Sequence, residues 1–108
     1  NSITNVTAMD KRRLEIKVGI SYHSDLLKAK DILRRLVEED PELLEREEIQ
    51  IFVDQLADSA VILGIRAWVR TDEYWNTKWR MNERIKLEFD ANGIQIPFPQ
   101  MDVYLQQK

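Results

Sequence analysis

The stretch RLEIKVGISY (residues 13–22) decides the fold class, because its polar and apolar residues alternate without a break. One face would carry Leu14, Ile16, Val18, Ile20 and Tyr22, and the other Arg13, Glu15, Lys17, Gly19 and Ser21. A period of two is typical of a strand with one face buried and the other in water. The chain therefore needs a layer that covers one side of a sheet.

The pattern changes to a helical one over residues 26–39. Ser24 and Asp25 offer N-cap oxygens just before it. The apolar residues then follow the three-four spacing of one helix face: Leu26, Ala29, Ile32, Leu33, Leu36 and Val37. Asp40 should end the helix, because a residue that precedes proline is pushed out of helical conformation.

A hairpin is predicted next, with strands around residues 49–53 and 61–69 joined through Asp58 and Ser59. Thr71 or Asp72 would cap a second helix that runs to about Ala91. We expect one side of this helix to carry Trp75, Trp79, Asn82, Lys86 and Phe89, with Ile85 beside them.

Asn92 and Gly93 should stop the second helix, because glycine adopts the left-handed conformation at little cost. A short fourth strand with Ile94 and Ile96 would follow, and then a fifth with Met101, Val103 and Leu105. The order strand, helix, strand, strand, helix, strand predicts an α+β domain of the ferredoxin-like βαββαβ type. Its helices would cover one face of an antiparallel sheet.

Composition narrows the classes of function. The 108 residues suit one domain. The chain has no cysteine, so it has neither disulfides nor thiolate metal sites, and its net charge of -3 argues against nucleic-acid binding. The longest apolar run, residues 60–65, is too short to cross a bilayer. Because the chain begins with Asn1 and not Met, we expect a trimmed piece, with membrane segments upstream left open.

No recognisable catalytic equipment is present. His23 is the single histidine and lacks the partners that a base or a metal site needs, so a solvated loop residue is the better interpretation. The acidic run over residues 38–48 lacks the oxygen pattern of a calcium loop and is interpreted as a solvated face. The three glycines are too far apart to cradle a phosphate. We therefore predict no enzyme activity, no cofactor and no metal.

Aromatic residues gather near the junction of the third strand and the second helix: Trp68, Tyr74, Trp75 and Trp79. Arginines interleave with them, which could suggest base stacking. Since the chain is acidic overall, packing in the core and at an interface is the better interpretation.

The segment Gly93 to Leu105 resists a purely local explanation. Pro97 and Pro99 set a fixed, extended corner around Phe98, and Gln100 begins a well-patterned strand after the domain is complete. Because the prolines lack the N–H donors that would extend the sheet, this strand needs a partner elsewhere. We predict that it pairs with the same strand in neighbouring copies, and that these residues serve assembly: Gly93, Pro97, Phe98, Pro99, Gln100, Met101, Val103 and Leu105.

This tail carries a resemblance to a known family. The residues from Glu83 to Lys86, Phe89-Asp90, Gly93-Ile94 and the run from Ile96 to Val103 resemble the C-terminal region of the small-conductance mechanosensitive channel family (MscS-like). Three further stretches also match the family in order and spacing: residues 1–5, 19–25 and 66–68.

The resemblance implies a division into residues 1–10, the tail of a preceding β domain, residues 11–97, a ferredoxin-like cage domain, and residues 98–108, an assembly strand. It implies a homo-heptameric channel in the inner (plasma) membrane that opens under tension during osmotic shock. This domain would lie on its cytoplasmic side, where it would support assembly and filter solutes. The membrane would be reached through segments outside this chain, and no nucleic acid would be bound.

A different class stays open beside this one: a free-standing ferredoxin-like module that binds a small ligand. Such a module should show glycine-rich or basic loops at its helix starts, whereas Ser24-Asp25 and Thr71-Asp72 are wrong for anions. The upstream sequence would separate the two hypotheses, since a channel needs apolar stretches of about twenty residues.

Overall fold

The structure is a computed structural model, and it describes residues 10–98. The described chain contains four strands, β1 (Lys11–Ile20), β2 (Leu43–Leu44), β3 (Gln50–Leu56) and β4 (Val61–Arg70), and two α-helices, α2 (Leu26–Glu39) and α3 (Tyr74–Ala91). Two 3-10 turns complete it, η1 (Arg46–Glu48) and η2 (Thr71–Glu73). The predicted α+β class is confirmed.

Strand β4 is the centre of one antiparallel sheet. It pairs along its whole length with β1, from Lys11 opposite Arg70 to Ile20 opposite Val61. Its other edge is shared: β3 pairs with it up to Gln50 opposite Arg66, and β2 pairs with it at Leu43 and Leu44. A bulge at Asp54 interrupts the β3 register. The predicted hairpin is therefore present, and β2 with η1 is an excursion that the sequence patterns did not indicate.

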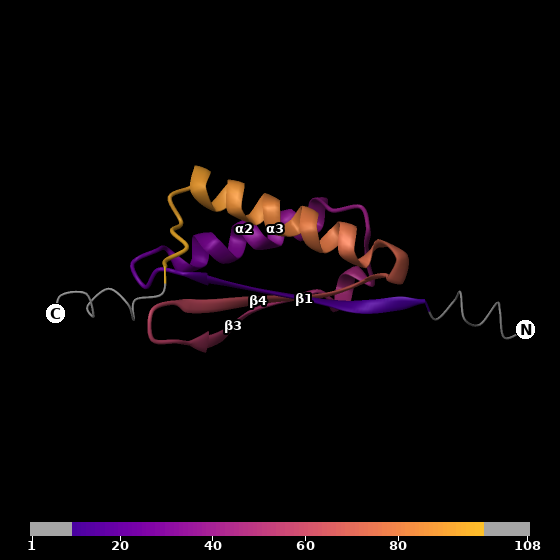
Figure 1. Cartoon of the computed structure of the whole chain (residues 1–108), viewed down its shortest axis with the longest axis horizontal. Helices are drawn as coiled ribbons and strands as arrows, with labels where there is room; N and C mark the ends of the chain where they lie inside the picture. The colour runs from indigo at the N-terminus through magenta and orange to yellow at the C-terminus, as the bar shows by residue number, and fades with distance from the viewer. Residues whose placement is uncertain (1–9, 99–108) are drawn as a thin grey trace, which may run out of the picture.

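Both helices lie on the same face of this sheet (Figure 1). The alternating residues of β4 are buried beneath them: Val61, Leu63, Ile65, Ala67 and Val69. From α2 they are met by Ala29, Ile32, Leu33, Leu36 and Val37. This two-layer arrangement buries the apolar faces and leaves the other face of the sheet to solvent, as the period of two in β1 predicted.

The predicted ends of α2 are confirmed. The Asp25 side chain accepts a hydrogen bond from the Lys28 N–H at 3.1 Å, which satisfies one of the free donors of the first turn. Asp40 has extended backbone angles and ends the helix before Pro41. Strand β1 spans residues 11–20, so it starts two residues earlier than predicted and leaves Tyr22 in the following turn.

Of the side of α3 that the sequence analysis singled out, Ile85 and Phe89 are buried, and the tryptophans are not. The buried residues are Tyr74, Thr77, Met81, Ile85 and Phe89, whereas Trp75 and Trp79 are 52% and 60% exposed. Thr77 and Met81 therefore pack between the helix and the sheet, and the two indole rings lie on the solvent side. The predicted cap was also wrong: the Asp72 carboxylate binds Arg70, and η2 leads into the helix without a side-chain cap.

Residues 94–96 form no strand in the described chain, which corrects the predicted fourth strand. The Ile94 N–H is taken by the Phe89 carbonyl at the helix end, and Pro97 has no N–H to give. One backbone hydrogen bond joins this segment to the residue after β1: the Ser21 N–H donates to the Gln95 carbonyl at 2.9 Å. The predicted fifth strand lies outside the described residues.

Candidate functional site

The exit from α3 is the described part of the predicted assembly segment. Gly93 has a φ of +76°, as expected for a left-handed helix stop, and a Cβ built there would meet nothing within 4 Å. Ile94 is buried, and the Gln95 N–H donates to Ser24 Oγ at 3.2 Å. The chain is thus fixed against the start of α2 before it turns outward.

Beyond Gln95 the side chains become exposed. Ile96 is 37% exposed, Pro97 is half-buried and Phe98 is 83% exposed. The other predicted assembly residues lie outside the described residues: Pro99, Gln100, Met101, Val103 and Leu105. The assembly role of the whole segment therefore stays a prediction, while the helix stop at Gly93 is seen directly.

A second exposed apolar feature is the tryptophan ridge on α3, formed by Trp75 and Trp79. Their ring centroids lie 5.9 Å apart, one helical turn along the same side. Tyr74 packs edge-on against Trp75 at 5.0 Å, and Lys78 Nζ lies 5.6 Å from the Trp75 ring. Large aromatic side chains contribute strongly to interfaces when exposed together. Tyr74 is therefore part of the core and the tryptophan ridge is exposed, while packing of the ridge at an interface stays a prediction.

The seam between α2 and α3 holds a buried ion pair that the sequence analysis misassigned. Asp40, which we expected on a solvated acidic face, has a fully buried carboxylate. Arg80 donates to both of its oxygens at 3.0 Å, and the Glu42 N–H donates to it at 2.9 Å. This pairing raises the pKa of Arg80 above its ordinary value, the hydrogen bonds to Asp40 being the largest cause. The spacing of forty residues gave no signal for it.

Arg46 reinforces the same corner from η1. Its guanidinium donates to the carbonyls of Val37 and Asp40, which are among the last acceptors of α2. Satisfying free carbonyls at a helix end with a cation is favourable twice, through the hydrogen bonds and through the helix dipole. Farther along the seam, Arg84 pairs with Glu39 and Arg35 with Glu88, but the members of these pairs are exposed or half-buried.

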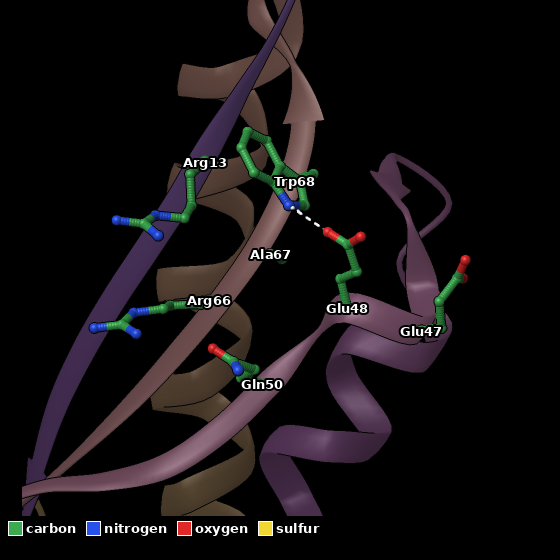
Figure 2. Close-up of a pocket in the computed structure, with 7 residues that line it drawn as sticks. All are labelled: Arg13, Glu47, Glu48, Gln50, Arg66, Ala67 and Trp68. Carbon is green, nitrogen blue, oxygen red and sulfur yellow. Dashed lines mark hydrogen bonds between the residues drawn. The ribbon is translucent and has the colours of Figure 1, made fainter.

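The open face of the sheet carries a hollow of about 440 Å³, shown in Figure 2. It is lined by Arg13, Glu47, Glu48, Gln50, Arg66, Ala67 and Trp68. The hollow exists because the edge of β4 changes partner here: β3 covers it up to Arg66, β2 covers it from Trp68, and η1 turns aside between them. Glu45 at the turn has a φ of 48°, which is unusual for a residue other than glycine.

Ion pairs cross the open face beside this hollow. Arg66 Nε donates to Glu15 at 2.7 Å, and this bond, more than the charge alone, lowers the pKa of Glu15. Arg70 lowers the pKa of Asp72 in the same way. The Phe52 ring lies over Gly64, where a Cβ would come within 2.6 Å of it, so glycine is required by the close approach. These contacts hold the side chains on the open face of the sheet in place.

Within residues 10–98, His23 and the acidic side chains are the candidates for a catalytic or metal site. His23 is exposed, and the interaction at this residue is its backbone N–H donating to Ser21 Oγ. Within the same range no cluster of His, Cys, Asp or Glu could hold a metal ion. Neither α2 nor α3, the helices of the described chain, is long and apolar enough to cross a membrane.

The chain matches the family model of the C-terminal domain of the mechanosensitive ion channel MscS over residues 14–96. An MscS family protein of Archaeoglobus fulgidus is 43% identical over 104 residues, which are 96% of this chain and 37% of that protein. The small-conductance mechanosensitive channel of Edwardsiella ictaluri is 36% identical over 106 residues, 98% of this chain and 37% of the channel.

The architecture agrees with these relatives. The closed-state crystal structure of Helicobacter pylori MscS superposes with a TM-score of 0.75 at 27% identity, covering 82% of this chain and 36% of that one. The chain thus spans little more than a third of the length of the proteins it matches. Its fold, its buried pattern and its helix exit all belong to the matched region, and the chain is a member of the MscS mechanosensitive channel family that corresponds to the family's C-terminal domain.

Proposed function

We propose that this chain is the cytoplasmic domain of a channel that sits in the plasma membrane and opens under tension during osmotic shock. Within the channel, this domain would hold copies of the protein together as a homo-heptamer and would filter the solutes that reach the pore. Membership of the MscS family supports the channel role. The finer assignment rests on surfaces of this domain that suit contact with other copies.

The first such surface is the tryptophan ridge. Trp75 and Trp79 present two indole rings to solvent in a domain whose core is otherwise complete. Burying one large aromatic side chain at an interface stabilises it by about 1.5–3 kcal/mol. A ring of identical copies needs two different surfaces on each copy, because a head-to-tail contact joins unlike patches.

The second surface is the exit segment at the other end of the domain. Figure 1 shows the described chain entering through β1 at one end of the long axis and leaving after α3 at the opposite end. If copies are arranged in a ring with their long axes along the rotation axis, their exit segments all lie at the same end of the ring and come together there. In that arrangement the residues after Phe98 would pair strand to strand in parallel, since rotation keeps their direction. A closed ring of such strands has no free edge.

The first experiment compares the complete channel protein with a form truncated after Phe98, each sized by light scattering in detergent. We expect the truncated form to lose the heptameric mass or to melt at lower temperature. An unchanged mass with unchanged thermal stability would contradict the assembly role of the tail.

The ridge is tested separately with Trp79→Ala in the complete protein. Because Trp79 is already 60% exposed, the substitution should cost the isolated 108-residue chain little stability while weakening the assembled form. Leu56→Ala is the matched control, since Leu56 is 71% exposed at the end of β3, away from α3. Equal effects of the two substitutions on assembly would show that the ridge has no special role.

Channel activity itself is measured in membrane patches that contain the complete protein. We expect conductance that appears only when suction stretches the patch. A patch that stays closed up to rupture, with the protein shown to be present, would contradict the proposed gating.

A further inference from the structure

Strand β1 lies at the edge of the sheet, and one of its sides is open. Among residues 10–98 it pairs with β4 alone, in an unbroken register from Lys11 to Ile20. The Thr71 N–H donates to the Asp10 carbonyl at 3.1 Å, so Asp10 and every second residue after it point their backbone groups toward β4. The residues between them therefore point their N–H and C=O groups to the open side: Lys11, Arg13, Glu15, Lys17 and Gly19.

The chain that leaves α3 starts to pair with this open side. The Ser21 N–H donates to the Gln95 carbonyl at 2.9 Å, as it would in an antiparallel pair of strands. Figure 1 shows β1 and α3 ending at the same end of the domain, so a chain that turned back there would run antiparallel to β1. The second bond of such a pair is replaced, because the Gln95 N–H donates to Ser24 Oγ at 3.2 Å.

The backbone bond at Ser21 fixes the register in which the chain could continue along β1. Each two residues forward on the added strand meet two residues backward on β1. Pro97 would therefore stand opposite Gly19. Two residues farther, Pro99 would stand opposite Lys17. At both positions the added strand must donate an N–H to a β1 carbonyl, and proline has none.

The side chains of the same segment have the pattern of a strand in that register. Residues that alternate with the prolines would stand opposite the residues of β1 that face the helices, and would therefore face the helices too. These residues are all apolar: Ile94, Ile96 and Phe98. Ile94 is buried, but the side chains of Ile96 and Phe98 are exposed. The apolar pattern thus favours a strand over residues 94–98, and the backbone of the prolines opposes it.

We infer that Pro97 and Pro99 keep residues 94–99 from completing the sheet along β1, and that this leaves the rest of the tail available to other copies. The first part concerns this domain alone, and the second part rests on the proposed assembly role of the tail. An open strand edge is a template for any strand that can match its hydrogen bonds. Since the chain leaves α3 beside this edge, its own tail is the nearest such strand, and the two absent donors prevent that pairing.

Amide hydrogen exchange in the 15N-labelled 108-residue chain tests the first part. The double variant Pro97→Ala with Pro99→Ala restores both donors without adding bulk. The N–H groups of Gly19 and Lys17 should then exchange more slowly by about fivefold or more, because each gains a backbone partner. The Val18 N–H points toward β4 with or without the substitutions, so it is the internal reference and its exchange should not change.

Phe98→Ala is the matched control, because it alters the same segment and leaves both prolines in place. It should leave the exchange of Gly19 and Lys17 unchanged. Unchanged exchange in the double variant would overturn the inference, and so would exchange at Gly19 in the unsubstituted chain that is as slow as at Val18. Pairing within one chain does not depend on protein concentration. A slowing that grows with concentration would mean that β1 pairs with another copy, which also contradicts the inference.

The second part is measured in the complete protein by light scattering in detergent. If the restored donors draw the tail along β1, the double variant should lose heptameric mass or melt at lower temperature. Slow exchange at Gly19 together with unchanged mass and melting temperature would overturn the second part alone. A failure of the proposed function is distinguishable from this result, because truncation after Phe98 would then also leave mass and melting temperature unchanged.

Discussion

The buried ion pair between Asp40 and Arg80 allows the sharpest test of how the domain is held together. Arg80→Met removes the cation while keeping a long side chain of similar helix propensity. The Asp40 carboxylate, whose side chain is 0% exposed, would keep the Glu42 N–H as its one remaining partner from the present set. A buried carboxylate without a cation is strongly unfavourable.

The size of the expected loss in stability depends on how deeply the Asp40–Arg80 pair is buried. Breaking a fully buried pair by removing one partner costs about 3–5 kcal/mol. Because the Arg80 side chain is 37% exposed, part of this pair already faces water, and we expect a loss of about 2–4 kcal/mol in the free energy of unfolding. At ~4–8 °C per kcal/mol, the melting temperature should fall by roughly ten degrees or more.

Arg84→Met is the matched control on the same helix. Arg84 pairs with Glu39 across the same seam at 2.7 Å, and its side chain is about as exposed as that of Arg80, but the Glu39 side chain is 47% exposed whereas that of Asp40 is buried. Exposed pairs contribute about 0–1 kcal/mol. Urea unfolding of the two variants therefore compares the loss of a cation beside a buried carboxylate with its loss beside an exposed one. If Arg80→Met is no more destabilising than Arg84→Met, the assignment of a buried, stabilising pair is wrong.

A double variant separates lost charge from lost packing. Adding Asp40→Asn to Arg80→Met removes the uncompensated buried charge and keeps an oxygen for the Glu42 N–H. We expect the double variant to be more stable than Arg80→Met alone by about 1 kcal/mol or more. Equal stability would mean that the methylene packing of Arg80, and not its charge, accounts for the loss.

Three further outcomes are expected, each measured by urea unfolding. Gly93→Ala should cost about 1–2 kcal/mol from the positive φ alone, since the added Cβ meets nothing, and an unchanged midpoint would contradict this. Gly64→Ala should cost about 1–3 kcal/mol through contact with the Phe52 ring, a loss that Phe52→Leu should relieve. The lowered pKa of Glu15 makes its contribution complete above the ordinary value of 4.5 and lost as the pH falls through the lower folded value. Arg66→Met should therefore flatten the acid side of the stability profile, and an unchanged profile would show that the pair contributes nothing.

The sequence by itself determined the elements that have a strong local period or a local stop. The alternation from Leu14 to Ile20 predicted β1, and the stripe from Ala29 to Val37 predicted α2, because each pattern must bury one face wherever it lies. The stops at Asp40 and Gly93 were also local, since they depend on the backbone preferences of Pro41 and of glycine. The resemblance to the family spanned most of the chain, and its most specific part was the segment that begins at Gly93.

Only the tertiary structure decided which residues of α3 are buried and which partners meet across the chain. The weak amphipathic pattern of this helix allowed two faces, and packing against the sheet chose Thr77 and Met81 over Trp75 and Trp79. The Asp40–Arg80 pair joins residues forty positions apart, and a carboxylate in an acidic run looks solvated until a guanidinium is placed beside it. The hollow likewise exists only where two strands share one edge of β4. Periodicity reports the face that each element must bury, whereas long-range pairs and hollows arise from how the elements are set against one another, which no local pattern specifies.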